Sequence, residues 1–287
     1  MMRRLHSLSA AGAVVLALAS FDFAVPVGMV KIPGGTFEYG TDSAALVALM
    51  AQYHVSDPSV LGPEAPQRQV TVKPFYLDKG DVTVADFVRF VVKDTAWLPK
   101  GDSAKFSNGD YLSMWAKGRV VAGSDSIPVT WVTWFSARAY CRFMGRRLPT
   151  EVEWEYAARG GANGGDIFPW GDAPADTTRA NYGASGIGHP TRAGIYAANG
   201  YGLYDMAGNV WQFTADQWSD PRDPPPAKGP VVLAPWSKDP SIDLLTRVVI
   251  RGGSYDGAPV NMRVRYRDSH PAGGAKPFVG FRCAKDG

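Results

Sequence analysis

The chain has 287 residues, 45% of them hydrophobic, and its 30 Lys and Arg residues against 27 Asp and Glu residues give a net charge of +3. This composition supports a globular core and excludes a disordered or collagen-like chain. The small net charge lacks the basic footprint of a nucleic-acid-binding protein, so we expect no nucleic-acid partner. The 32 Gly, 22 Pro and 9 Trp residues predict long, turn-rich loops and little regular secondary structure.

The first 24 residues resemble a secretory signal peptide. Arg3 and Arg4 precede an apolar run over residues 8–19, which ends in a small-residue cleavage motif at Ala19. A membrane-spanning helix needs about 20 apolar residues, and this run is shorter. We therefore predict a signal peptide over residues 1–24, cleavage near Ala19, and a periplasmic or secreted protein without a membrane span; retention as an uncleaved anchor is the alternative.

The N-terminal part of the mature chain predicts two strand segments with one helix between them. Residues 29–40 place β-favouring residues on both sides of a Pro-Gly-Gly turn, which predicts a hairpin. Residues 70–78 alternate like a strand, and Pro74 favours an edge position because proline cannot donate a ladder hydrogen bond. Residues 44–55 between them have helical composition.

Three further helices are predicted by their end signals. Thr83 is the expected N-cap of a helix that runs to residue 92. A second helix covers residues 136–144 and stops at a glycine. A third follows Thr150, with Glu153 at the capping-box position and a glycine stop. The stretches 161–190 and 218–243 are expected to be loops, and residues 247–284 short strands around turns.

The chain has only two cysteines, Cys141 and Cys283. In an exported protein an even number of cysteines indicates a disulfide. Two buried thiols and a catalytic cysteine are the alternatives, and the spacing along the chain does not separate them.

A series of motifs resembles one family, the formylglycine-generating enzymes or sulfatase-modifying factors. The motifs span nearly the whole mature chain and are IPGGTF at 32–37, PVTWVTW at 128–134, GRRLPTEVEWEYAARGG at 145–161, NGYGLYDMAGNVW at 199–211, RGGSY at 251–255 and GFRCA at 280–284. The resemblance implies one α+β domain over residues 25–287, with a fold related to C-type lectins and little regular secondary structure. It also implies that Cys141 and Cys283 form a structural disulfide.

The same resemblance bears on redox metals. Family members that oxidise a sulfatase cysteine bind copper(I) through two further cysteines after the Gly-Gly-Ser motif, and residues 255–263 contain none. Copper(I) prefers soft sulfur ligands, and Met262 alone offers a weak one, so we expect no copper site. Another branch holds iron(II) through histidines. His54, His189 and His270 are widely separated here, and we expect solvated or hydrogen-bonded loop residues in preference to an iron site.

The resemblance places a substrate cleft at the Gly-Gly-Ser segment. Candidate catalytic residues are Ser254, Asp256 and His270, and the substrate-binding candidates are Ser254, Arg263, Arg267 and Trp211. For Asp256 and His270 the favoured alternative is a solvated loop residue. An arginine there could hold a peptide carboxylate by charge-assisted hydrogen bonds. A structural role is the alternative for both arginines and is favoured for Arg267; for Trp211 the alternative is a place in the core.

Calcium is a further expectation from the resemblance. The candidate ligands are Asn181, Tyr182, Gly208, Asn209, Val210 and Gln212. Calcium needs six or more oxygen ligands, and carboxylates raise its affinity. Because Gln212 stands where the family usually has Glu, and no Asp or Glu occurs between Asn181 and Tyr204, we expect one or both calcium sites to be weakened.

We therefore expect an exported monomer that binds a peptide or small molecule and oxidises it, if at all, without the copper–cysteine mechanism. An exported branch of the family, which includes a periplasmic protein of siderophore maturation, also lacks the copper cysteines. This chain resembles that branch in its predicted export and in its missing cysteines. The alternative is a catalytically inert binding or accessory module of an envelope complex. Sulfatase activation by formylglycine generation ranks third.

Overall fold

The computed structural model describes residues 25–99, 101–115, 123–161, 167–219 and 244–287. The predicted signal peptide and most of the predicted loop at 218–243 lie outside these residues. Within the described part of the chain, no helix combines the length and apolar character needed to cross a membrane.

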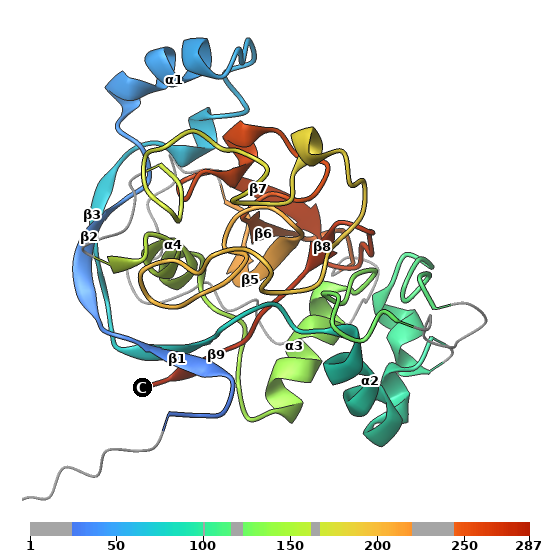
Figure 1. Cartoon of the computed structure of the whole chain (residues 1–287). Helices are drawn as coiled ribbons and strands as arrows, with labels where there is room; N and C mark the ends of the chain where they lie inside the picture. Colours follow the sequence, from blue (N-terminus) through green and yellow to red (C-terminus); the bar gives the residue numbers. More distant parts are fainter. Residues whose placement is uncertain (1–24, 100, 116–122, 162–166, 220–243) are drawn as a thin grey trace, which may run out of the picture.

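Short helices and strands are joined by long loops, as the composition predicts. The α-helices are α1 (Leu46–Gln52), α2 (Val84–Lys93), α3 (Trp134–Phe143) and α4 (Glu151–Ala158). The strands are β1 (Met29–Ile32), β2 (Gly35–Tyr39), β3 (Arg68–Val72), β4 (Phe75–Asp78), β5 (Trp211–Gln217), β6 (Arg247–Arg251), β7 (Arg267–Pro271), β8 (Val279–Gly280) and β9 (Ala284–Asp286). The result is an α+β domain (Figure 1).

The hairpin predicted over residues 29–40 is wrong. Both strands form, but β1 pairs with β4 and β2 pairs with β3, each antiparallel. The two chain segments thus run side by side, and their pairing is interrupted at residues 33–34 and 73–74. A side chain at Gly34 would meet the carbonyl oxygen of Val72 at 2.6 Å, so this close approach requires glycine.

The edge position predicted from Pro74 is also wrong for the second half of that segment. The structure ends β3 at Val72 and begins β4 at Phe75, so Pro74 lies between two strands. Strand β4 is the central strand of a three-stranded sheet of order β1-β4-β9. Proline is compatible with this arrangement because it precedes the ladder.

The predicted helix caps are confirmed for α2 and α4. Thr83 accepts from the Asp86 amide, and Thr150 accepts from the Glu153 amide; the carboxylates of both capping boxes bond back to the N-cap. Helix α3 begins two residues earlier than predicted, because Thr133 caps it. Local side-chain-to-backbone bonds therefore decide where these helices begin.

The C-terminal part forms a four-stranded sheet of order β7-β6-β5-β8 in the middle of the molecule (Figure 1). The largest hydrophobic cluster combines side chains of this sheet with those of α2 and α3. A second cluster joins α4 to β1 and β4. Helix α1 projects from the body and has no buried residue. The sheet thus carries β6 and the Gly-Gly-Ser segment that follows it.

Candidate functional site

The Gly-Gly-Ser segment is a tight turn directly after β6. Gly252 and Gly253 adopt φ angles of 98° and 74°, in the left-handed region that favours glycine. Ser254 is buried, and its hydroxyl donates to Oδ1 of Asp256 over 2.6 Å. Asp256 itself is exposed. The turn therefore presents a serine–carboxylate pair with the carboxylate at the surface.

Two other segments hold this turn by backbone hydrogen bonds. Gly208 donates to Gly252 over 2.8 Å, and Tyr255 donates to the carbonyl of Asn209 over 2.9 Å. Gly183 donates to Gly257 over 2.9 Å. Residues far apart in sequence thus meet at the turn.

His270 lies away from this turn. It lies on β7 opposite Val248, whereas Ser254 follows the other end of β6. Its ring lies near Phe213 and Phe278, with centroids 6.1 and 6.4 Å away. Burial lowers the pKa of His270 to about 4, so the ring is neutral at physiological pH. The structure therefore separates this candidate from Ser254 and Asp256.

Arg263 is engaged by a single carboxylate. Its two terminal nitrogens donate to both oxygens of Glu64 over 2.7 and 2.9 Å. The side chain is 3% exposed, and the Tyr53 ring lies 5.6 Å from its guanidinium carbon. Bidentate pairing of this kind fixes the guanidinium plane. In this structure Arg263 anchors the chain that follows the turn to the segment around Glu64.

Arg267 is engaged in the same way by a different carboxylate. It donates to both oxygens of Glu151 over 2.7 and 2.8 Å and to the carbonyl of Pro63 over 3.1 Å. The Trp218 ring lies 4.8 Å from its guanidinium carbon. The pKa of Glu151 is lowered despite burial, because Arg267 and Arg251 stabilise its charge. This arrangement matches the structural alternative raised for Arg267.

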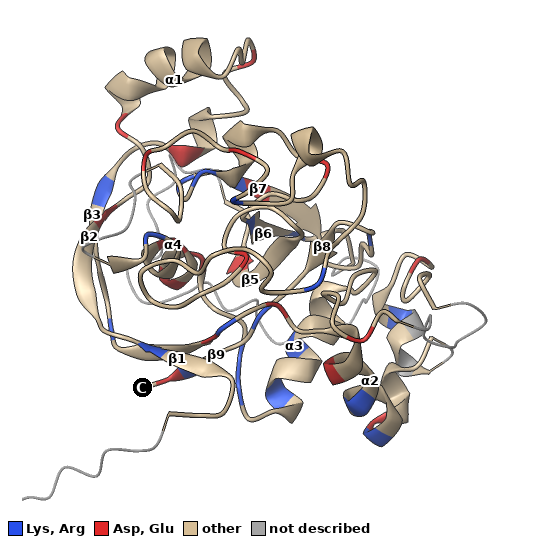
Figure 2. Cartoon of the chain, viewed as in Figure 1, with Lys and Arg blue, Asp and Glu red and all other residues tan. Residues whose placement is uncertain are grey.

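An ionic cluster beneath the turn was missed by the sequence analysis. Arg251 has no exposed surface and donates to Glu155 over 2.6 Å and to Glu151 over 3.2 Å. Glu155 also accepts from Arg159 over 2.9 Å. The two glutamates lie on α4 and Arg251 on β6, elements whose acidic and basic residues are red and blue in Figure 2. The four-residue spacing of Glu151 and Glu155, which puts both on one helical face, was the available signal.

Trp211 begins β5 and is 7% exposed. Its ring centroid lies 6.0 Å from that of Tyr266, which is also buried. Burial raises the pKa of Tyr266. Both rings thus pack within the largest hydrophobic cluster.

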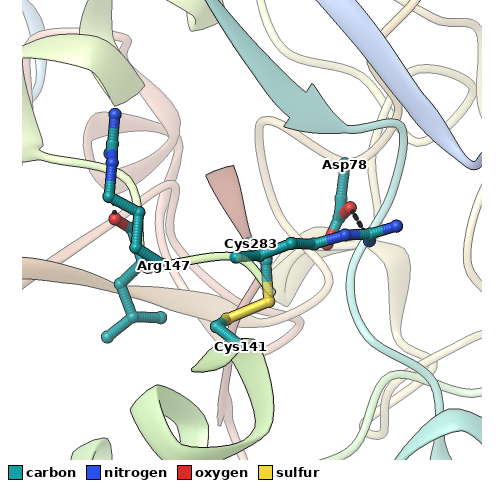
Figure 3. Close-up of a disulfide and its surroundings, with 6 residues drawn as sticks. Asp78, Cys141, Arg147 and Cys283 are labelled. Carbon is teal, nitrogen blue, oxygen red and sulfur yellow. Dashed lines mark hydrogen bonds and ion pairs between the residues drawn. A yellow bond between two sulfur atoms is a disulfide. The ribbon is translucent and has the colours of Figure 1, made fainter. Parts of the chain in front are cut away.

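Cys141 of α3 and Cys283 are joined by a disulfide, with sulfurs 1.97 Å and Cα atoms 5.6 Å apart (Figure 3). The amide of Cys283 donates to Asp78 over 2.8 Å. Beside the bridge, Arg147 and Ala284 exchange two backbone hydrogen bonds, of 2.8 and 2.6 Å. No free cysteine is left in the chain.

Comparison with known proteins agrees with this architecture. The profile of the sulfatase-modifying factor enzyme 1-like domain matches residues 22–287. The chain belongs to the sulfatase-modifying factor family. It is 31% identical to the formylglycine-generating enzyme of Bos taurus, with 91% of this chain and 75% of that protein covered. It is 34% identical to the inactive C-alpha-formylglycine-generating enzyme 2 of Bos taurus, with 90% and 88% covered.

Among solved structures, PvdO from Pseudomonas aeruginosa superposes with a TM-score of 0.64 at 23% identity. The match covers 90% of this chain and 94% of PvdO. At this identity the likeness shows the shared fold.

In this family member, the segment after the Gly-Gly-Ser turn contains no thiol, because both cysteines of the chain lie in the disulfide. In the described residues, no group of three or more His, Cys, Asp or Glu side chains is arranged to hold a metal ion. The donors around the turn are hydroxyl, carboxylate and amide groups, which do not fit copper(I).

The six calcium candidates lie in two buried places. Asn181 and Asn209 lie within hydrogen-bond distance of each other behind the turn. Tyr182 packs in a small cluster with Met262, and Val210 is fully buried. Gln212 lies on β5, with its amide in the protein interior.

A group of buried carboxyls lies around Arg282. Burial raises the pKa of Asp81 from 3.8 to about 8, and the nearby Asp205 carboxyl adds to the shift while Arg282 opposes it. Arg282 donates to Oδ1 of Asp81 over 3.4 Å, whereas Oδ2 has no hydrogen-bond partner. Ionised Asp81 is therefore poorly compensated.

This environment predicts a pH-dependent stability. When the pKa of a carboxyl is higher in the folded than in the unfolded state, its contribution to stability is fully present at a pH below the pKa of the unfolded state. That contribution is lost as the pH rises through the pKa of the folded state. For Asp81 the interval runs from near 3.8 to about 8. We expect Asp81→Asn to lose stability less steeply than the wild type over this interval in urea unfolding. Parallel curves for the two proteins would contradict the assignment.

Proposed function

We propose that this chain is an exported family member that binds a peptide or small molecule at the Gly252–Gly253–Ser254 turn, and that any oxidation it carries out proceeds without copper–cysteine chemistry. The observation that carries the second part is the Cys141–Cys283 disulfide, which uses both cysteines of the chain. Thiolate is the ligand that copper(I) prefers, and a bridged sulfur does not supply it.

The turn supports a polar ligand. Asp256 is exposed, with one oxygen already held by the Ser254 hydroxyl, so a ligand amine or hydroxyl can donate to the carboxylate. Tyr255, partly exposed, supplies an aromatic face and a hydroxyl beside it. In contrast, Arg263 and Arg267 are engaged by Glu64 and Glu151, so a ligand must compete with buried carboxylates for them.

A catalytically inert binding or accessory role is the second candidate. It is favoured by the 34% identity to a relative that is named inactive. The likeness to PvdO, at 23% identity, supports the fold of the first candidate and leaves its substrate open.

The first experiment addresses formylglycine generation. The purified, non-reduced protein is incubated with a sulfatase-derived cysteine peptide, copper and oxygen, and the peptide is analysed by mass spectrometry. We expect no aldehyde, while a copper-loaded formylglycine-generating enzyme converts the same peptide. Copper-dependent turnover by this chain would overturn the proposal.

The second experiment separates oxidation from inert binding. Elemental analysis of protein purified from its native compartment measures copper and iron per chain. A stoichiometric redox metal supports an oxidase that recruits ligands other than thiolate, and its absence supports the binding module. Fractionation of the producing cells tests export, since the signal peptide predicts the protein outside the cytoplasm.

A further inference from the structure

Gln212 lies in a pocket that matches an amide. Its Oε1 accepts from the Trp154 indole over 2.7 Å and from Arg282 over 2.8 Å, while its Nε2 donates to the carbonyl of Asp205 over 2.7 Å. The side chain is fully buried. A carboxylate could accept the first two bonds but could not donate the third, and it would face a carbonyl oxygen at close range. The pocket therefore suits the amide of Gln212 and does not suit a carboxylate.

The positive charge beside this pocket is already supplied by the chain. Arg282 has no exposed surface and donates to the carbonyls of Asp78, Lys79, Tyr204 and Asp205 over 3.2, 3.4, 2.7 and 3.3 Å. These four carbonyl oxygens are therefore engaged by the guanidinium. A divalent cation bound to Gln212 would lie next to this guanidinium, and like charges in a buried site repel strongly.

The second set of candidate calcium ligands is also internally satisfied. Asn209 Oδ1 accepts from the Thr191 amide over 2.9 Å and from Asn181 over 3.3 Å. Asn181 Oδ1 accepts from the Ser185 hydroxyl over 2.8 Å, and the Asn181 carbonyl accepts from the Asn209 amide over 2.8 Å. These neutral groups offer none of the carboxylates that give calcium its affinity.

We infer that this chain supports its Ser254 turn with an amide network in place of calcium, so that folding and turn geometry are independent of the ion. This network comprises two separate sets of hydrogen-bonded side chains, Asn181 with Asn209, and Gln212 with its partners. The network reaches the turn directly. The carbonyl of Asn209 accepts from Tyr255, and the adjacent Gly208 donates to Gly252. The inference goes beyond the proposed function, because it concerns the support of the turn whatever ligand the turn binds.

The first test compares chelated protein with protein in millimolar calcium by thermal unfolding. A cation that binds only the folded state raises Tm by mass action, by several degrees when it is far above its dissociation constant. We expect the two Tm values to coincide. A saturable rise of several degrees with calcium would overturn the inference.

The second test uses Gln212→Glu, which changes the amide to a carboxylate of equal size. We expect a lower Tm, because the hydrogen bond to the Asp205 carbonyl is lost. We expect calcium not to restore the wild-type Tm, because the Arg282 guanidinium already supplies the positive charge at this place. Recovery of the wild-type Tm in calcium would show a cation pocket and overturn the inference.

The third test reads the turn itself by hydrogen exchange of residues 252–257. We expect wild-type exchange to be the same with and without calcium, and Asn209→Ala to exchange faster in both. Asn108→Ala is the matched control, since Asn108 is exposed and, among the described residues, its side chain bonds to nearby Asp110. Slower wild-type exchange in calcium, or an unchanged rate in Asn209→Ala, would contradict the network.

Discussion

Replacing Cys141 and Cys283 together by alanine is expected to remove up to about 5 kcal/mol from the free energy of unfolding. The two residues are 142 positions apart, so the bridge closes a long loop and restricts the unfolded chain. The chain-entropy model gives about 5 kcal/mol for such a loop, and native disulfides measure roughly 2 to 5 kcal/mol. Alanine avoids burying a hydroxyl at two fully buried positions.

Urea unfolding of the non-reduced wild type and the double variant measures the difference. Reduced wild type serves as the control and should unfold close to the variant, because both lack the same constraint. Mass spectrometry of the non-reduced protein, purified from the producing cells, should find no alkylatable thiol. Coincident unfolding curves for oxidised wild type and variant, or two free thiols, would refute the structural role of the bridge.

Replacing Arg251 by Met is expected to cost about 3 kcal/mol, at the low end for breaking a buried ion pair, because Glu151 and Glu155 each lose one arginine partner but keep another, Arg267 and Arg159 respectively. Arg251 donates to Glu151 and Glu155 and to the carbonyls of Val264 and Arg265 over 2.7 and 3.3 Å. Its guanidinium also lies 5.3 Å from the centre of the Trp154 ring. The loss should appear as a shift of the urea midpoint.

Arg179→Met is the matched control. Arg179 forms an ion pair with Asp176 over 2.7 Å, but the two side chains are 39% and 46% exposed. Exposed pairs of this kind contribute about 0 to 1 kcal/mol. Equal losses for Arg251→Met and Arg179→Met would show that burial of the cluster does not determine its contribution.

The ion pairs also bear on which residues of the candidate site can meet a ligand. Family-based reasoning offers Arg263 and Arg267 as ligand-binding groups, yet each is paired with a carboxylate of another segment. The groups at the turn with exposed surface are instead Tyr255 and Asp256. Ligand-binding experiments should therefore begin with variants of these two residues.

The sequence by itself determined what depends on neighbours along the chain. The capping boxes at Thr83 and Thr150 are bonds between residues three positions apart, so they can be recognised locally and both helices begin where predicted. The motif series identified the family and its α+β fold, and the cysteine count together with that resemblance predicted the disulfide that the structure contains.

Only the tertiary structure decided the contacts between distant segments. β1 pairs with β4, and not with the adjacent β2, because side chains of both strands pack in the second hydrophobic cluster, which distant segments build together. Arg263 pairs with Glu64, which lies 199 residues away, and the buried amide of Gln212 is satisfied by Trp154, Asp205 and Arg282. A buried polar group must find its partners wherever the fold supplies them, and no local pattern records which residues those are.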